Sequence, residues 1–200
     1  MIDGLPVPPG LRQQLGFLLA AHDLTAVVRL NRLLDGSRGE TSAEHSWHLA
    51  LTAITLAADV APGVDLARVV TMLLIHDLPE VYAGDVPIYD EAARAAVAEA
   101  EWEAATRLFG QLPAEQGAEM LALWHEFERA ETADARFAKA IDRLQPLLLH
   151  CAGDGAVWAE RGVTVEQERR LMSVIEAYWP ALGPVATALI DDAHRRGLLS

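Results

Sequence analysis

Cysteine is almost absent from this chain of 200 residues, and the single one, Cys151, has no partner for an internal disulfide. A reducing compartment is therefore the natural setting, and a zinc knuckle built from paired cysteines is excluded. No apolar run approaches the roughly 18 residues that span a bilayer. The N-terminal MIDGLPVPPG has neither a basic segment nor an apolar core, so we expect no secretory signal and a cytoplasmic protein.

Basic residues are also scarce, with 16 Lys and Arg against 29 Asp and Glu and a net charge of −13. This charge repels phosphate backbones at long range, so we expect neither a nucleic-acid polymer nor a membrane as a partner. A small phosphate ester can still be a substrate if a metal ion and a few local arginines overcome the repulsion.

Alternating patterns typical of strands are missing as well, whereas Ala and Leu, which favour helices, dominate the composition. Thr41 to Glu44 resembles a capping box and predicts a helix to about Asp59, and Asp65 is a predicted cap for a helix that ends at His76-Asp77. Pro79 can begin a short helix before a loop through Asp85 and Pro87. Helical spacing predicts further helices over residues 10–34 (divided near Asp23), 90–109, 113–129, 133–150, 166–178 and 184–196. The predicted fold is all-α, a single compact helical bundle.

Three polar positions in or beside these apolar helices are candidates for chemistry. The pair His76-Asp77 is a weak signal alone, because buried helices commonly end in polar residues. Asp142, however, falls on an otherwise apolar helical face, where an unpaired carboxylate would cost several kcal/mol; an arginine could neutralise it, but a metal ion would explain it better. With His45, these residues would give two imidazoles and two carboxylates on three helices, a ligand set suited to Mn, Fe, Co, Ni or Zn.

Three segments, EHSWH, HDLPEVYAGD and AIDRLQP, resemble the HD superfamily of metal-dependent phosphohydrolases, in particular the branch that includes the 5′-deoxynucleotidases. The pattern of that family is H…HD…D, with a Glu four residues and an Asp nine residues beyond the paired His. The resemblance covers about residues 24–150. It implies one HD domain over residues 1–200, with the C-terminal helices 166–197 packed on this core.

The resemblance also implies the site residues. One divalent metal ion (Mn, Co, Fe, Ni, Zn or Mg) would be held by His45, His76, Asp77 and Asp142. Glu80 and Asp85 fall where the family has active-site acids near the attacking water and the substrate. Which of the two acts as acid or base stays open, and Glu80 could instead cap or salt-bridge a helix end.

Arginines that precede His45 are expected to contact the phosphate, by the same resemblance. Arg29 matches best and Arg38 next, although either could be a solvated surface residue. Related deoxynucleotidases tend to have a tryptophan directly after this arginine, whereas Leu30 and Asn31 stand here, so the preference between deoxyribose and ribose is open. His48, three residues beyond His45, could share its helix face as a hydrogen bonder.

The expected activity is metal-dependent hydrolysis of nucleoside 5′-monophosphates to nucleoside and phosphate. Two alternatives stay open: an HD hydrolase of another small phosphoester, and a non-catalytic metal- or nucleotide-binding module. The presence of Glu80 and Asp85 favours an enzyme, because a structural site needs only the four ligands. A homodimer is expected, since related domains often pair through helices and the C-terminal segments are apolar.

Overall fold

The computed structural model describes Gly4, residues 6–85 and residues 91–200, with side chains omitted for residues 91–97. The helices are α1 (Pro9–His22), α2 (Ser42–Val60), α3 (Leu66–Ile75), α4 (Glu80–Ala83), α5 (Glu91–Phe109), α6 (Ala114–Arg129), α7 (Ala133–Ala152), α8 (Ala156–Arg161), α9 (Val165–Tyr178) and α10 (Gly183–Arg195). Short 3₁₀ turns cover η2 (Asp23–Ala26) and η3 (Pro180–Leu182), and the two strands are β1 (Val28–Arg32) and β2 (Gly39–Thr41).

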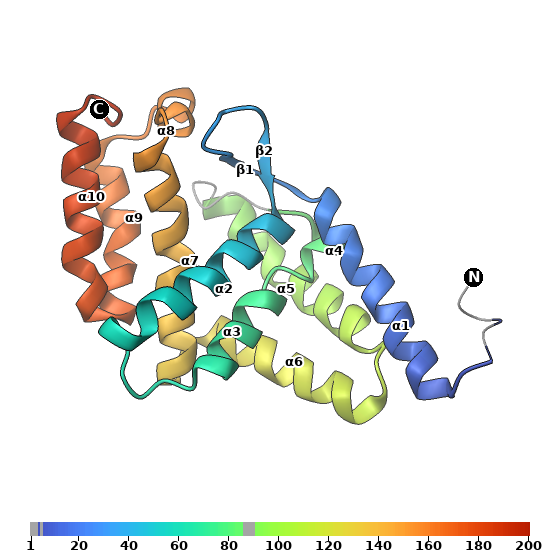
Figure 1. Cartoon of the computed structure of the whole chain (residues 1–200). Helices are drawn as coiled ribbons and strands as arrows, with labels where there is room; N and C mark the ends of the chain where they lie inside the picture. Colours follow the sequence, from blue (N-terminus) through green and yellow to red (C-terminus); the bar gives the residue numbers. More distant parts are fainter. Residues whose placement is uncertain (1–3, 5, 86–90) are drawn as a thin grey trace.

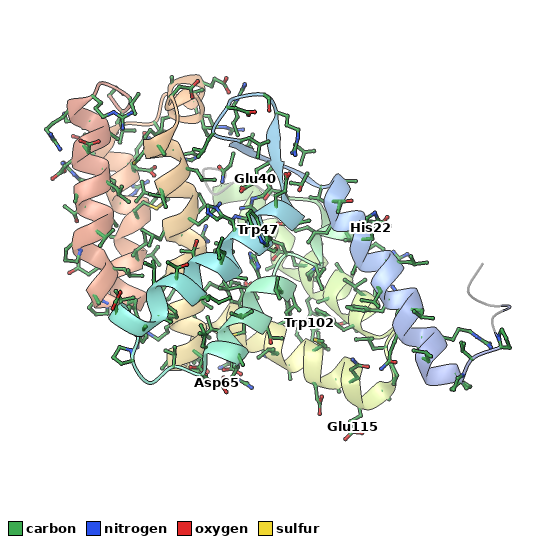
Figure 2. All side chains as sticks on the ribbon, viewed as in Figure 1. His22, Glu40, Trp47, Asp65, Trp102 and Glu115 are labelled. Atoms are coloured by element: carbon green, nitrogen blue, oxygen red, sulfur yellow. The ribbon has the colours of Figure 1, made fainter. Side chains whose placement is uncertain are left out.

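Helix α7 lies between two groups of helices (Figure 1). On one side α9 and α10 pack against it, and on the other α2 and α3 do. Side chains fill the space between these helices (Figure 2), and the larger buried cluster includes Leu49, Met72, Ile141, Ile175 and Ile190. A second cluster joins α1, α5 and α6 through Phe17, Leu108, Phe109 and Trp124. The predicted all-α bundle is confirmed.

Two helix starts follow directly from local sequence. Thr41 Oγ1 accepts from the Glu44 N–H at 3.2 Å, and the Glu44 carboxylate accepts from the Thr41 N–H at 2.9 Å, which forms the predicted capping box at the start of α2. The Asp65 carboxylate likewise accepts from the Arg68 N–H and caps α3. These caps determine where α2 and α3 begin. Helix α2 carries His45, and α3 ends directly before His76.

The prediction of helix over residues 10–34 is wrong in its second half. Helix α1 ends at His22, and Val28–Arg32 forms strand β1, which pairs antiparallel with β2. Side chains alternate along β1, with residues 29 and 31 half-buried and residues 28, 30 and 32 exposed. Because the inward side chains are Arg29 and Asn31, the strand lacks the apolar-inside alternation that identifies strands in a sequence.

Other differences are small. Helix α8 and turn η3 lie in segments for which no element was predicted. Pro87 and Asp90, expected in a loop and at a helix start, lie outside the described residues. Among the described residues, no helix is both long enough and apolar enough to cross a membrane.

Candidate metal centre and active site

Four predicted ligands meet where α2, the end of α3 and α7 come together. His45, His76 and Asp142 each offer one ligand atom, and these atoms lie within 4.8 Å of one another. His45 Nε2 is 3.2 Å and His76 Nε2 is 3.6 Å from Asp142 Oδ1, and Asp77 Oδ1 is 2.9 Å from His76 Nε2. All four side chains are buried. The fold therefore brings together residues that are up to 97 positions apart in the chain.

The hydrogen bonds of the two imidazoles suit a cation at this point. His45 Nδ1 lies 2.9 Å from Gln145 Oε1, and His76 Nδ1 lies 2.9 Å from Leu73 O. Both partners only accept, so in a neutral ring each Nδ1 carries the hydrogen and each Nε2 presents a lone pair. His76 Nε2 is buried and makes no hydrogen bond with the described residues. Two nitrogen lone pairs and the Asp142 carboxylate in one cluster, with Asp77 beside His76, fit a divalent metal ion.

Electrostatics at the centre also favour positive charge. Burial lowers the pKa of His76, but Asp77 and Asp142 outweigh it and raise the pKa to about 10. Burial raises the pKa of Asp77, but His76 and Arg29 outweigh that effect and hold it below its ordinary value. The pKa of Asp142 is held well below its ordinary value for the same kind of reason, by Arg143 and the histidines. Both carboxylates therefore stay ionised, as metal ligands must.

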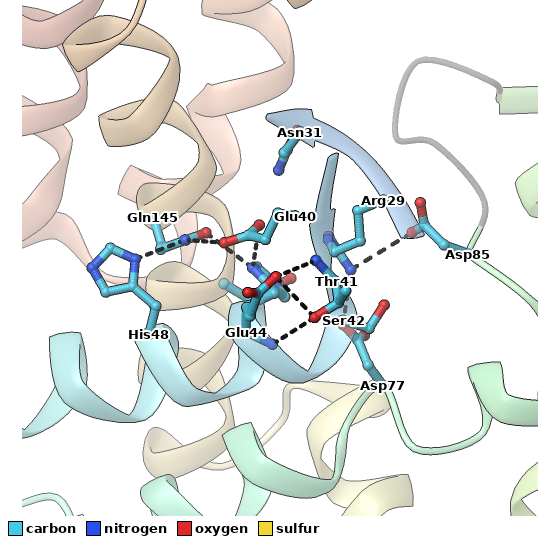
Figure 3. Close-up of polar contacts among 12 residues, drawn as sticks. Arg29, Asn31, Glu40, Thr41, Ser42, Glu44, His48, Asp77, Asp85 and Gln145 are labelled. Atoms are coloured by element: carbon cyan, nitrogen blue, oxygen red, sulfur yellow. Dashed lines mark hydrogen bonds and ion pairs between the residues drawn. The ribbon is translucent and has the colours of Figure 1, made fainter. Parts of the chain in front are cut away.

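A network behind His45 holds the ring in place (Figure 3). Gln145 Oε1 accepts from His45, while Gln145 Nε2 donates to Glu40 Oε1 at 3.1 Å and to His48 Nδ1 at 2.9 Å. His48 thus reaches the site through Gln145, as its spacing from His45 suggested. Such partners set which ring nitrogen faces the metal.

Arg29 joins the two predicted acids to the metal ligands. Its Nη1 lies 2.8 Å from Asp77 Oδ2, 3.6 Å from Asp85 Oδ1 and 3.8 Å from Glu80 Oε1. Glu80 is held from the other side by the Ser42 hydroxyl, which donates to Glu80 Oε2 at 2.6 Å. The alternation of side chains along β1 explains the arrangement, because it turns Arg29 inward, beside the N-terminus of α2 (Figure 3).

The two acids hold protons more tightly than ordinary carboxylates do. Burial and the neighbouring Asp77 raise the pKa of Glu80 to about 8, although Arg29 opposes the shift. Burial also raises the pKa of Asp85, again against Arg29. A carboxyl group with a pKa near neutrality can both give and take a proton at physiological pH. Glu80 has this property in the described structure.

These groups line one end of a cavity of about 280 Å³. Asp77, Glu80, Asp85 and Asp142 face it together with Arg29. Further along, its wall is formed by β1, α7 and α9, through Leu30, Asn31, Pro146, Leu147, His150, Glu168 and Met172. The cavity thus joins the candidate ligands to a wall that combines apolar side chains with the polar Asn31 and His150.

Arg38 is not brought to this cavity, in contrast to the prediction that it contacts substrate. Its guanidinium donates to the Glu44 carboxylate and to Gly39 O, and half of its side chain is exposed. The hairpin explains the difference, because Arg38 precedes β2 whereas Arg29 lies within β1 and faces inward. Of the two arginines expected there, Arg29 alone lines the cavity.

Three polar residues that support the candidate ligands and Glu80 through hydrogen bonds were not predicted as functional: Glu40, Ser42 and Gln145. Gln145 follows Asp142 by three positions, a spacing that places both on one helix face, so the sequence did contain a signal for it. Glu40 and Ser42 carry no such signal, because their contacts with Gln145 and Glu80 depend on how the hairpin packs against α7 and α4.

Comparison with known proteins agrees with this geometry. A family model described as HD domain matches residues 21–181. The human 5′-deoxynucleotidase HDDC2 is 28% identical over 140 residues, which cover 70% of this chain and 67% of that protein, and the Bos taurus protein of the same name gives the same figures. The 5′-deoxynucleotidase hdd1 of Schizosaccharomyces pombe is 27% identical over 134 residues, or 64% of this chain and 66% of that protein.

Solved structures show the same fold. A protein described as a predicted metal-dependent phosphohydrolase from Magnetospirillum magnetotacticum MS-1 is 48% identical, with a TM-score of 0.89 over 96% of each chain. An HD-domain phosphohydrolase from Listeria innocua, 18% identical, superposes with a TM-score of 0.62 over 92% of this chain and 95% of its own, which shows the fold alone. With the family model covering most of the sequence and the H…HD…D residues gathered in one buried centre, the chain belongs to the HD domain family.

Proposed function

We propose that this protein is a metal-dependent phosphohydrolase that converts nucleoside 5′-monophosphates to nucleoside and phosphate. The observation that carries the proposal is the meeting of the buried candidate ligands His45, His76, Asp77 and Asp142 with an arginine and two acids of raised pKa beside a cavity. The volume of about 280 Å³ is near the lower end for small-ligand pockets, which suits a mononucleotide better than a polymer. The 5′-deoxynucleotidase relatives support the same substrate class.

The metal centre would take one divalent ion on His45, His76, Asp77 and Asp142. When bound, such an ion polarises a phosphoryl oxygen and lowers the pKa of water. Arg29 is placed to bind the phosphate beside it, because its guanidinium reaches Asp77, and its buried Nε makes no hydrogen bond with any described residue. A guanidinium binds phosphate through two parallel N–H donors, which would orient the ester as well as neutralise charge.

Glu80 and Asp85 would handle the protons. With a pKa of about 8, Glu80 can protonate the leaving 5′-oxygen or, once ionised, take a proton from the attacking water. The Ser42 hydroxyl keeps Glu80 Oε2 in position, so that Oε1 stays toward Arg29. Asp85 lies on the other side of Arg29, where it would contact the sugar or assist the proton transfer.

The test is phosphate release from a panel of ribo- and deoxyribonucleoside 5′-monophosphates after chelator treatment, with Mn²⁺, Co²⁺, Mg²⁺ or Zn²⁺ added back. We expect metal-dependent release from part of the panel. Asp77→Asn should lose at least about a hundredfold, because changing even a residue that only supports a metal ligand typically costs about 10- to 100-fold. Asp191→Asn, at an exposed Arg169 pair on α10, is the matched control and should retain full activity. No release by folded, metal-loaded protein would refute the proposal.

Three finer points remain predictions: the identity of the metal, a cytoplasmic location and a homodimer. Support for the dimer comes from α2, where Trp47, Leu51 and Ile54 are exposed at helical spacing. A second copy of the chain would cover this apolar face.

A further inference from the structure

Asn31 and His150 form a polar pair in the part of the cavity away from the metal centre. Asn31 lies two residues after Arg29 on β1, and the alternation of the strand turns both side chains inward (Figure 3). Two residues of a regular strand span at most roughly 6.6 Å, and β1 pairs irregularly with β2 between Val28 and Arg32. A ligand whose phosphate lies at Arg29 would therefore present its next polar groups near Asn31.

His150 determines which way the Asn31 amide faces. His150 Nε2 lies 3.0 Å from Asn31 Oδ1, an oxygen that only accepts, so the ring nitrogen donates. The ring is buried and packs edge-on against Trp158 with centroids 5.1 Å apart. Burial lowers the His150 pKa to about 4, so the ring is neutral at physiological pH and its one N–H is the one that Asn31 accepts.

This arrangement leaves the two N–H groups of Asn31 Nδ2 without a hydrogen bond to any described residue, while Asn31 lines the cavity. A donor oriented by a buried neighbour and facing a cavity is suited to an uncharged acceptor in the ligand. In a nucleoside 5′-monophosphate, the acceptors next along from the phosphate are the sugar hydroxyls. Beyond Asn31, the apolar side chains of Pro146, Leu147 and Met172 would accept the base.

We propose that Asn31, held in place by His150, donates a hydrogen bond to a hydroxyl of the substrate sugar and so determines sugar specificity. The inference rests on the proposed nucleotidase function. A substrate without that hydroxyl leaves the Asn31 donor unpaired on binding, and an enclosed site that loses such a bond discriminates against the analogue.

The test combines removal of the donor, the Asn31 amide, with removal of the acceptor, a hydroxyl of the substrate sugar. The kcat/KM values of adenosine 5′-monophosphate and of its 2′-deoxy and 3′-deoxy analogues are measured with the wild type and with Asn31→Ala. We expect the wild type to lose about tenfold on one deoxy analogue, the cost of one hydrogen bond. In Asn31→Ala this ratio should fall to within about twofold, because the two changes remove the same bond. Asn31→Leu, which keeps the side-chain volume, replaces the alanine variant if that variant does not fold.

His150 is tested as a positioning residue by two variants. His150→Phe keeps an aromatic ring against Trp158 but has no donor, and should reduce the sugar discrimination, whereas His150→Gln supplies an N–H and should restore it. Arg32→Ala, on the same strand but facing outward to Glu160, is the control and should keep the wild-type ratio.

Two outcomes separate this inference from the proposed function. If the wild type hydrolyses nucleotides but shows no sugar discrimination, or if Asn31→Ala keeps the full wild-type ratio, the role of Asn31 is overturned and the nucleotidase stands. If the wild type releases phosphate from no nucleotide, both fail together.

Discussion

At the scale of single residues, the geometry of the site depends on buried histidine rings that each donate a hydrogen bond to one acceptor. Gln145 Oε1 and Leu73 O accept from the Nδ1 atoms of His45 and His76, so the opposite nitrogens turn to the metal position. His150 is constrained in the same way by Asn31 and by burial. In each case one acceptor orients the imidazole ring, and the role of the ring follows from the nitrogen that remains.

The buried neutral state of His150 predicts a pH-dependent loss of stability. Its pKa is about 4 in the folded protein and about 6.5 when unfolded, so between these values the unfolded state binds more protons. Stability should fall as the pH drops from about 6.5 to about 4, by at most on the order of 3 kcal/mol from this group. The measurement is the free energy of unfolding of wild type and His150→Gln over this range, with metal in excess.

The difference between the two unfolding free energies isolates His150, because His45 and the other candidate metal ligands are present in both proteins. The His150→Gln variant should show a flatter dependence on pH. Parallel curves for the two proteins would contradict the prediction.

At the scale of elements, the β-hairpin positions Arg29, the proposed phosphate-binding residue. Strand β1 carries Arg29 and Asn31 inward, and β2 leads directly through the Thr41 capping box into α2, whose second turn carries His45. The hairpin therefore couples the position of Arg29 to that of His45, although its two strands are short.

Gly39 is needed for the close approach of the two strands. A Cβ at this position would lie 2.6 Å from Val28 Cγ1 and 2.9 Å from Arg29 O, so backbone would have to move. We expect Gly39→Ala to destabilise the protein by about 1–3 kcal/mol and to lower kcat/KM by displacing Arg29. Thermal unfolding and phosphate release measure the two effects.

Gly16→Ala is the matched control, because a Cβ at Gly16 in α1 meets nothing within 4 Å. It should leave activity unchanged and stabilise the protein by about 0.5–1 kcal/mol through helix propensity. Equal stability of the Gly39→Ala variant and the wild type would contradict the prediction, because it would show that the two strands can move apart to fit a Cβ at no cost.

At the scale of the whole molecule, helix α2 leaves an apolar face uncovered. The two buried clusters account for the inner faces of the helices, yet α2 still exposes Leu51 and Ile54, with 45% and 53% of their surfaces accessible. Exposed apolar residues gathered on one helix face are typical of an interface.

We expect the protein to be a homodimer that uses this face. The double variant Leu51→Glu/Ile54→Glu should become monomeric with little change in thermal stability, because charges at the interface oppose association while both side chains are solvent-exposed in the monomer. Light scattering after size exclusion measures the mass. Leu18→Glu/Leu19→Glu on α1, also exposed, is the control and should stay dimeric. A monomeric wild type would refute the prediction.

Much of the fold was predictable because helix formation is decided locally. The caps at Thr41 and Asp65 and the helical spacing of apolar residues led to α2, α3 and the other long helices near their observed bounds. The hairpin was not predictable in this way, because its inward side chains are Arg29 and Asn31 and its pairing partner lies several residues further along the chain.

The sequence alone determined the set of candidate ligands and acids, His45, His76, Asp77, Glu80, Asp85 and Asp142, because their residue types and spacing form a pattern. Only the tertiary structure decided that Arg29 and not Arg38 lines the cavity, that Gln145 and Glu40 hold the ring of His45, and that Asn31 is oriented by a histidine 119 positions away. The physical reason is that each motif lies within one short segment of the sequence, whereas hydrogen bonds between distant segments form only once helices and hairpin have packed together.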